Sequence, residues 1–554
     1  MKYTGAKIIM ECLMQQQVDT IFGFPGSMVL GIYDALCDYP QIQHVLMCHE
    51  QHAAHAADGY ARATGKTGVV VATSGPGATN LVTGIATAYM DSVPMVAITG
   101  NVEKKNLGKD SFQEIDITGI TIPITKHNVI VKEVGELAQA LREAFYIAQS
   151  GRKGPVLVDI PKDVLMQECE YIPQPPLPIS PCNSFCEQDI KDAAAAIGAS
   201  KKPFIFAGGG VISAHAQEEL YALAKKLDAP VALSLMGIGA YPASDAQYTG
   251  MIGMHGTKAS ALCASNCDLL IAIGTRFSER VTAERNQFAK QAKILHIDVD
   301  PAEINKNMDA AYEVVGDAKD VLCALLPKIK QNKTNDWLQK ALNWKEKYPL
   351  DRAGKNARFP KKLLQTLQAE APKDAIFTTE VGQHQMWAAQ FLKIEQPRKF
   401  LSSGGLGTMG FGLGAAIGAA IGTKKRVINI AGDGSFHMNM QELITAVTYH
   451  LPVTVLILKN NTLGMVRQWQ KLFYDGRYSQ TTLMRPIDYV KLAESLGAVG
   501  YDISNEKDLQ TALRKTFEQD GPVVLKCDIC EDENVLPMIP DGKSLDDMIL
   551  DLNK

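Results

Sequence analysis

Two polar residues follow neighbouring apolar runs in the C-terminal third of the chain and could share a divalent cation. Val427–Ile430 leads into Gly432-Asp433-Gly434, and Val453–Leu458 leads to Asn460. Because parallel strands end at one edge of a sheet, Asp433 and Asn460 could lie together. Mg²⁺ in proteins is often bound by one or two protein oxygens, and phosphate oxygens complete its coordination. The glycines would let such an anion come close to the N-terminus of the next helix. A lone Gly-Asp-Gly is more often a tight turn, but the asparagine at this spacing favours the metal.

A carboxyl group near the N-terminus also invites a chemical interpretation. Glu50 follows the apolar run Val45–Met47 and precedes a helix rich in small residues. A zinc-protease helix needs His-Glu-x-x-His, but position 53 is alanine, so the spacing after His49 argues against that metal site. A carboxyl shielded from water can exchange a proton with a ligand. The alternative is a surface glutamate favoured at a helix N-terminus.

The elements that must position these residues alternate between strand and helix. Short apolar, β-branched runs predict strands at 69–71, 96–98, 156–158, 204–206, 269–271 and 427–430. Such runs separated by helical patterns predict doubly wound α/β domains with parallel sheets covered on both faces. The proline-rich segment 172–178 and the polar stretch 345–361 look like linkers. We therefore expect three domains, at residues 1–170, 185–345 and 360–554.

The first and last domains repeat the same order of parts. Residues 69–101 and 427–460 each run from a strand through a glycine turn and a helix to a second strand that ends in asparagine. Internal repetition of this kind indicates related units. Two related domains around a different middle domain suggest one cofactor held between two similar walls.

The composition narrows the class of protein. The 554 residues exceed a single core, and 46% hydrophobic with 21% charged residues is ordinary for a globular protein. A net charge of −4 argues against nucleic-acid and anionic-membrane partners. The 11 scattered cysteines predict reduced thiols, and with no leader or membrane segment in view we expect a cytoplasmic protein. The pair Cys527 and Cys530 is expected to lie in a strand.

The Gly-Asp-Gly turn and the asparagine resemble the signature of thiamine-diphosphate enzymes. Here 25 residues separate Gly434 from Asn460. The resemblance implies that Asp433, the Asn460 side chain and the main-chain oxygen of Thr462 bind Mg²⁺. Aligned on the next glycine, the family's Asn-Asn pair falls on Lys459-Asn460, so Asn461 is not expected to be a ligand. The implied diphosphate contacts are Gln383, His384, Gly434 and Ser435.

The same resemblance gives roles to residues outside this turn. Glu50 would hydrogen-bond the aminopyrimidine ring and so activate the coenzyme. Met409, in the glycine-rich segment 401–410, would wedge beneath the two rings and bend them, although a methionine is more often simply a core residue. Gly26 would lie near the cofactor, in a loop where Ser27 replaces the family's second glycine.

Further segments resemble one branch of these enzymes, the acetohydroxyacid (acetolactate) synthases. They are 73–80, 109–114, 161–164 and 465–470, and the resemblance extends to 535–540. It implies that Phe112, Gln113 and Lys162 face the reaction, and that Met465 and Trp469 shape the pocket for the second substrate.

The middle domain resembles the FAD-binding domain of the biosynthetic members. The residues that carry this expectation are Gly208, Gly209, Arg276, Arg280, Asp298 and Asp317. The two arginines could clamp a diphosphate, and Arg280 would also bound the substrate pocket. Two solvated surface arginines are the alternative.

The resemblance implies a transferase that decarboxylates pyruvate and joins the remaining two-carbon unit to pyruvate or 2-oxobutyrate. This reaction opens the biosynthesis of branched-chain amino acids. It also implies a homodimer or tetramer, with Glu50 of one chain facing Asp433 of another, and a small regulatory subunit. Three alternatives stay open: an FAD-dependent pyruvate oxidase, a flavin-free catabolic acetolactate synthase, and an inactive thiamine-binding regulatory paralogue.

Overall fold

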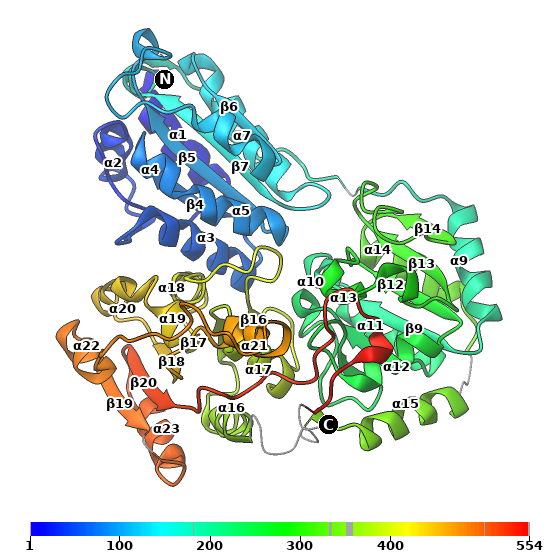
Figure 1. Ribbon diagram of the computed structural model, residues 1–554. Coiled ribbons are helices and arrows are strands. Elements are labelled where there is room, and N and C mark those ends of the chain that lie inside the picture. Colours follow the sequence, from blue (N-terminus) through cyan, green and yellow to red (C-terminus); the bar gives the residue numbers. More distant parts are fainter. Residues whose placement is uncertain (1, 181, 332–334, 351–357, 504, 552–554) are drawn as a thin grey trace.

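The computed structural model describes residues 2–180, 182–331, 335–350, 358–503 and 505–551. Three α/β domains, each built on a six-stranded parallel sheet, confirm the predicted fold class. The first and third domains are stacked on each other and the middle domain stands beside them (Figure 1). Among the described residues, no helix combines the length and apolarity needed to cross a membrane.

The first sheet has the strand order β3-β2-β4-β5-β7-β6. Its strands are β2 (Thr20–Gly23), β3 (Gln43–Leu46), β4 (Gly68–Ala72), β5 (Met95–Asn101), β6 (His127–Ile130) and β7 (Pro155–Pro161). Its helices are α1 (Gly5–Gln15), α2 (Leu30–Leu36), α3 (Glu50–Thr64), α4 (Pro76–Asn80), α5 (Val82–Met90), α6 (Ile117–Thr121), α7 (Val134–Gln149) and α8 (Lys162–Met166). A short antiparallel pair, β1 (Lys2–Thr4) with β8 (Glu168–Glu170), ties the ends of the domain together.

The third sheet repeats this order as β16-β15-β17-β18-β20-β19. Its strands are β15 (Ile376–Thr379), β16 (Phe400–Leu401), β17 (Val427–Gly432), β18 (Val453–Lys459), β19 (Val499–Ile503) and β20 (Val523–Asp528). Its helices are α16 (Arg358–Glu370), α17 (Gln383–Phe391), α18 (Gly412–Thr423), α19 (Asp433–Phe436), α20 (Leu443–Thr448), α21 (Gly464–Phe473), α22 (Tyr489–Ser495) and α23 (Leu509–Phe517). The matching order confirms the duplication seen in the sequence.

The middle sheet differs, with the order β11-β10-β9-β12-β13-β14. Its strands are β9 (Pro203–Ala207), β10 (Val231–Leu233), β11 (Tyr248–Met251), β12 (Leu269–Ile273), β13 (Lys293–Asp298) and β14 (Tyr312–Val315). Its helices are α9 (Glu187–Ala199), α10 (Gly209–Ser213), α11 (Gln217–Leu227), α12 (Lys258–Asn266), α13 (Glu279–Thr282), α14 (Ala318–Leu325) and α15 (Asn335–Lys347). Counted along the chain this is 3-2-1-4-5-6, the dinucleotide-binding order, which has a crevice where the direction of winding reverses.

Helices α3 and α18 join the first domain to the third. Small residues line the contact, and a Cβ on Gly59 would lie 2.5 Å from Ala415 Cα. Their alanines share one buried cluster with residues of both sheets. The helix α3 begins where predicted, because the His49 side chain accepts a hydrogen bond from Gln51 N and so caps its first turn. The helix ends at Gly65, which adopts a left-handed conformation with φ 81°.

The C-terminal segment leaves the third sheet after Asp528. Ile539, Leu545 and Met548 pack in a cluster with Phe204 of the middle domain, so the end of the chain ties these two domains together. The strand predicted across Cys527 and Cys530 is wrong at its end, because β20 stops at Asp528. All 11 cysteines are free thiols.

The two predicted linkers are described unequally. Residues 172–178 have neither helix nor strand, and they connect β8 to α9. The predicted linker at 345–361 includes residues 351–357, which lie outside the described residues.

Candidate active site

The predicted metal residues meet at the carboxyl edge of the third sheet. β17 and β18 are paired and parallel, with Gly432 opposite Leu458, so Asp433 and Asn460 leave the sheet side by side. The N–H of Asn461 donates to Asp433 Oδ2 at 2.9 Å, and Thr462 N donates to Asn460 Oδ1 at 3.0 Å. Asn461 has φ 55°, a left-handed conformation that asparagine tolerates, and its side chain is exposed. Burial raises the pKa of Asp433, whereas the backbone N–H groups around it lower it.

A cavity of about 1240 Å³ opens over this edge and extends to the middle domain. It exceeds the roughly 300–1,000 Å³ of an ordinary ligand pocket, so it has room for more than one ligand. Asp433, Asn460 and Thr462 line it. Among the described residues, no three His, Cys, Asp or Glu side chains gather as a metal site. A cation at Asp433 would therefore take further ligands from amide and phosphate oxygens.

The first turn of α17 supplies the next part of the cavity wall. The His384 ring packs over Gly432, where a Cβ would lie 2.8 Å from Nδ1, and burial lowers the pKa of His384 to about 3. Gln383 also lines the cavity, but its Nε2 donates to Gln468 Oε1 at 3.1 Å and to Glu533 O at 2.7 Å. The Gln383 amide thus braces the wall, while His384 lines the same cavity as Gly434 and Ser435.

A buried carboxylate, Glu380, holds the turn that carries Met409. Glu380 Oε2 accepts from Gly410 N at 2.7 Å and Ser435 Oγ at 2.9 Å, and Oε1 accepts from Leu413 N at 3.0 Å and Asn439 Nδ2 at 2.6 Å. Burial raises the pKa of Glu380, and these four donors oppose the rise. Glu380 therefore fixes Gly410, the neighbour of Met409, against Ser435, a predicted diphosphate contact.

The middle domain closes the other side of the cavity. The cavity is lined there by Gly209, Arg276, Asp298 and Asp317. Gly208 is not part of this wall and packs against Thr275, because a Cβ built on Gly208 would lie 2.8 Å from Thr275 Cβ. Asp317 caps α14 by accepting from Lys319 N at 2.9 Å. Burial raises the pKa of Asp298 to about 6.

Two predicted substrate residues from different domains meet at the mouth of this cavity. The Arg280 guanidinium lies 5.5 Å from the Trp469 ring centroid, a cation–π contact between the middle and third domains. Met465 lies one turn earlier on α21 and lines the same cavity. A half-exposed cation beside an aromatic wall can receive a small molecule that has a carboxylate and an apolar end.

The predicted N-terminal residues form a separate group. Glu50 is half-buried at the start of α3, and Asn80 Nδ2 donates to its Oε2 at 2.9 Å. A Cβ on Gly77 would lie 3.3 Å from Glu50 Oε1, and one on Gly26 would lie 2.5 Å from Thr73 Cβ. The lack of a side chain at Gly77 therefore lets its backbone pack close to the Glu50 carboxylate, and the lack of one at Gly26 lets that loop pack against Thr73. Ser27 does not have a positive φ, so it adopts its conformation without strain.

The remaining predicted residues lie around this N-terminal group. Gln113 has φ 58° and packs on Gly75, where a Cβ would lie 3.0 Å from Gln113 Cα. Phe112 is 82% exposed, and Lys162 starts α8 after β7. Glu50, Gly26, Phe112, Gln113 and Lys162 are not part of the wall of the large cavity. The predicted site residues of one chain thus form two groups, one on each related domain, and we call these groups half-sites.

Comparisons with known proteins agree with this geometry. Residues 3–120, 190–325 and 380–527 match family models for the N-terminal TPP binding, central and C-terminal TPP binding domains of thiamine pyrophosphate enzymes. The chain is 46% identical to the acetolactate synthase large subunit of Corynebacterium glutamicum, over 99% of this chain and 90% of that protein. It is 47% identical to the acetolactate synthase of Mycobacterium bovis, over 98% and 91%. The chain belongs to the acetolactate synthase family of thiamine diphosphate enzymes.

A third relative widens the range of organisms in this family. The probable acetolactate synthase large subunit of Methanocaldococcus jannaschii is 47% identical, over 98% of this chain and 95% of that protein. These matches cover all three domains, so the middle domain is part of the resemblance as well as the two TPP-binding domains.

Unpartnered polar groups in the cavity fit the cofactors typical of acetolactate synthases. Within the described residues, His384 Nε2 and Thr462 Oγ1 are buried without a hydrogen-bond partner beside Asp433. In the part of the chain that the structure describes, Arg276 is hydrogen-bonded only through its main-chain oxygen, by Asn307 Nδ2 at 2.9 Å, which leaves its guanidinium available for an anion. These groups fit the diphosphate of thiamine diphosphate with Mg²⁺ at one end of the cavity and the diphosphate of FAD at the other.

Sequence reasoning missed several residues that shape these half-sites. No role was predicted for Asn80, which holds Glu50 and ends the segment 73–80, or for Glu380 and Asn439, which hold the Met409 turn. Glu380 could have been found from the sequence, because it is a charged residue directly after a strand-like run, as Asp433 is. Asn80 has no such signal, because its partner lies 30 positions away on another helix.

Proposed function

We propose that this protein decarboxylates pyruvate and transfers the remaining two-carbon unit to a second 2-oxo acid, pyruvate or 2-oxobutyrate. The products are 2-acetolactate and 2-aceto-2-hydroxybutyrate, precursors of valine, leucine and isoleucine. The observation that carries the proposal is the cavity that joins the Asp433 and Asn460 edge to Arg280 and Trp469. Near-full-length similarity to acetolactate synthases supports it.

The chain's own groups have distinct tasks in this proposal. Bound thiamine diphosphate supplies the electron sink that decarboxylation needs. Asp433, Asn460 and the Thr462 main-chain oxygen would hold Mg²⁺, and His384 would hydrogen-bond the diphosphate. Glu50 would hydrogen-bond the pyrimidine ring and share a proton with it. Lys162 and Gln113 meet the incoming substrate.

The second substrate is selected at the cavity mouth. Arg280 attracts its carboxylate, and Trp469 packs on its alkyl group. An aromatic face accommodates the extra methyl group of 2-oxobutyrate, which favours this substrate over pyruvate. Gly209 and Arg276 would hold FAD in the crevice of the middle domain, where FAD would take no net redox part.

The activity assay is direct. Purified protein mixed with pyruvate, thiamine diphosphate, Mg²⁺ and FAD should form acetolactate without consuming oxygen. Oxygen uptake instead would identify a pyruvate oxidase. If a colourless protein forms acetolactate at a rate that added FAD does not change, the protein is a flavin-free synthase. If it binds thiamine diphosphate without turnover, it is an inactive paralogue.

We further propose that a second copy of the chain completes each site. Glu50 and Asp433 lie on separate half-sites of one chain. Exposed apolar side chains surround the loop before Glu50: Leu46 is 48% exposed, Met438 51% and Ile444 44%. Leu46 N donates to Tyr449 Oη at 2.8 Å, so this patch spans the first and third domains. A symmetric dimer that covers the patch would bring Glu50 of one copy to Asp433 of the other.

Mixing two inactive variants tests this arrangement. Glu50→Gln and Asp433→Ala should each be inactive alone. If subunits exchange at random, half the dimers are mixed and each has one intact site, so about a quarter of wild-type activity should return. If both residues served the same chain's site, mixing would restore nothing.

Two further proposals concern partners and location. Several relatives are named large subunits, which supports a small regulatory partner for this chain as well. The free thiols support a reducing, cytoplasmic location.

A further inference from the structure

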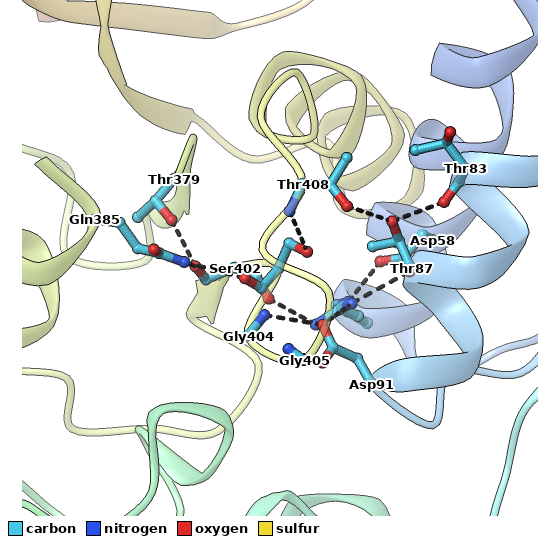
Figure 2. A network of polar contacts seen from close by, with 12 residues as sticks. Asp58, Thr83, Thr87, Asp91, Thr379, Gln385, Ser402, Gly404, Gly405 and Thr408 are labelled. Atoms are coloured by element: carbon cyan, nitrogen blue, oxygen red, sulfur yellow. Dashed lines mark hydrogen bonds and ion pairs between the residues drawn. The ribbon is translucent and has the colours of Figure 1, made fainter. Parts of the chain in front are cut away.

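The segment that carries Met409 is fastened to the first domain by a buried ionic cluster (Figure 2). Arg62 of α3 pairs with Asp58 one turn earlier and donates to Asp91 Oδ2 at 2.9 Å. It also donates to the main-chain oxygen of Ser402 at 3.0 Å. One guanidinium thus joins two carboxylates of the first domain to the backbone of the third.

Asp91 reaches the same segment directly. Its Oδ2 accepts from Gly404 N at 3.1 Å and its Oδ1 accepts from Gly405 N at 2.7 Å. A Cβ on Gly405 would lie 2.8 Å from that Oδ1, so the approach requires glycine. Asp91 therefore uses both carboxylate oxygens to hold two consecutive backbone amides.

A second fastening lies beside Met409 itself. Thr408 Oγ1 and Thr87 Oγ1 are 2.7 Å apart, and Thr87 Oγ1 donates to Thr83 O at 2.9 Å. Because the Thr87 proton is used on Thr83, Thr408 must be the donor to Thr87. Met409 thus lies between Thr408, tied to the first domain, and Gly410, tied to Glu380 of the third.

The ionic cluster is shielded from water, which makes it a stiff connection. The Arg62 side chain is 8% exposed, and the side chains of Asp58 and Asp91 are fully buried. Charge-assisted hydrogen bonds are short and directional, and they are little screened in such surroundings. Arg62 also lies over the Phe411 ring at 5.2 Å from its centroid, so both ends of the segment touch it.

We propose that Asp91, Arg62 and Thr87 are positioning residues that set the place of Met409 in the coenzyme site. Through them the first domain controls the shape of a site whose metal half it does not contain. The inference rests on the proposed function, because that function gives Met409 its role beneath the coenzyme rings. A cluster that only stabilised the domain contact would act on folding and would not depend on Met409.

A double-mutant cycle separates these roles. Asp91→Asn keeps the shape of the side chain but replaces one acceptor oxygen with an NH₂ donor. That donor must face other donors, either Gly404 N and Arg62 or Gly405 N, so at least one hydrogen bond is lost. We expect kcat to fall about tenfold or more in the wild-type background and less than twofold further in a Met409→Ala background. Equal fold losses in both backgrounds would overturn the proposal.

Asp159→Asn is the matched control. Asp159 is a buried carboxylate of the same domain that accepts from Thr99 Oγ1 and Asn101 Nδ2, each at 2.6 Å, and it does not contact residues 401–410. Its fold effect on kcat should be the same with and without Met409. If the effect of Asp159→Asn also shrinks in the Met409→Ala background, the cycle reports general destabilisation, and this outcome would also overturn the proposal.

Two measurements keep the test decisive. If Asp91→Asn does not fold, Thr87→Val removes the acceptor of Thr408 with little change in volume, and it should show the same dependence on Met409; an additive effect would refute the role. If the wild type forms no acetolactate, the proposed function fails by itself. The cycle is then measured on binding of thiamine diphosphate by fluorescence titration, where Asp91→Asn should weaken binding only when Met409 is present.

Discussion

Helices α3 and α18 pack so closely that we expect a single added methyl group, in Gly418→Ala, to push the first and third domains apart at this contact. A Cβ built on Gly418 would lie 2.6 Å from the carbonyl carbon of Ala56 and closer still to its oxygen. Carbon atoms pack best at about 3.5–4.0 Å, so the helices must part by roughly 1 Å or more. The obstructing atoms are backbone in the middle of a helix, which no side-chain rotation can remove.

The cost follows from the rigidity of that contact. Overpacking a core typically costs about 1–3 kcal/mol, and the upper end applies where backbone meets backbone. For a folding unit of this size, about 3 kcal/mol lowers a thermal midpoint by roughly 6–12 °C. Parting the helices also shifts α18, whose first turn Glu380 holds through Leu413 N. We therefore expect Gly418→Ala to weaken binding of thiamine diphosphate as well.

Calorimetry and coenzyme titration on matched variants would test this prediction. Gly198→Ala lies in helix α9, where a Cβ meets nothing within 4 Å; it should raise stability by up to about 1 kcal/mol. Gly422→Ala meets side chains of Thr64 and Tyr60, which can move, so its loss should be intermediate. A Gly418→Ala protein with the wild-type midpoint and coenzyme affinity would refute the close-packing argument.

Three further predictions concern the site and its surroundings. Asp433→Ala should weaken Mg²⁺-dependent binding of thiamine diphosphate by about 100-fold, measured by fluorescence titration; unchanged affinity would remove Asp433 from the metal site. Trp469→Leu should reduce the preference for 2-oxobutyrate over pyruvate by about tenfold, measured from products of an equimolar mixture; an unchanged product ratio would contradict the role of Trp469. Burial raises the pKa of Glu442 from 4.5 to about 7, so the unfolded chain loses this proton first and stability falls as pH rises between these values. Glu442→Gln should flatten that part of the pH profile of the thermal midpoint, because Glu442 contributes up to about 3 kcal/mol to the change in the free energy of unfolding there. An unaltered profile would show that Glu442 does not cause the fall in stability.

Local pattern was enough to find the residues that end strands or begin helices. Asp433, Asn460 and Glu50 were found this way, because an apolar run followed by a polar residue marks the edge of a parallel sheet. The duplication of the first and third domains was also visible, since each repeats one strand-turn-helix-strand order. The strand predicted through Cys530 failed because composition does not mark where a pairing partner ends.

The pairings that complete the site were decided by tertiary structure. Arg280 meets Trp469, and Arg62 and Asp91 hold Gly404 and Gly405, only because three domains pack in one arrangement. Gln383, predicted to contact the coenzyme, lines the cavity, and only the folded chain shows that its amide also donates to Gln468 and Glu533.

The sequence by itself thus determined the chemistry available and the edge of the sheet on which it stands. Only the folded chain decided which distant groups share that edge and which atoms they leave unpaired. The physical reason is that strand and helix periodicities arise from neighbours along the chain, whereas a hydrogen bond between Asp91 and Gly405 depends on how whole helices and sheets pack.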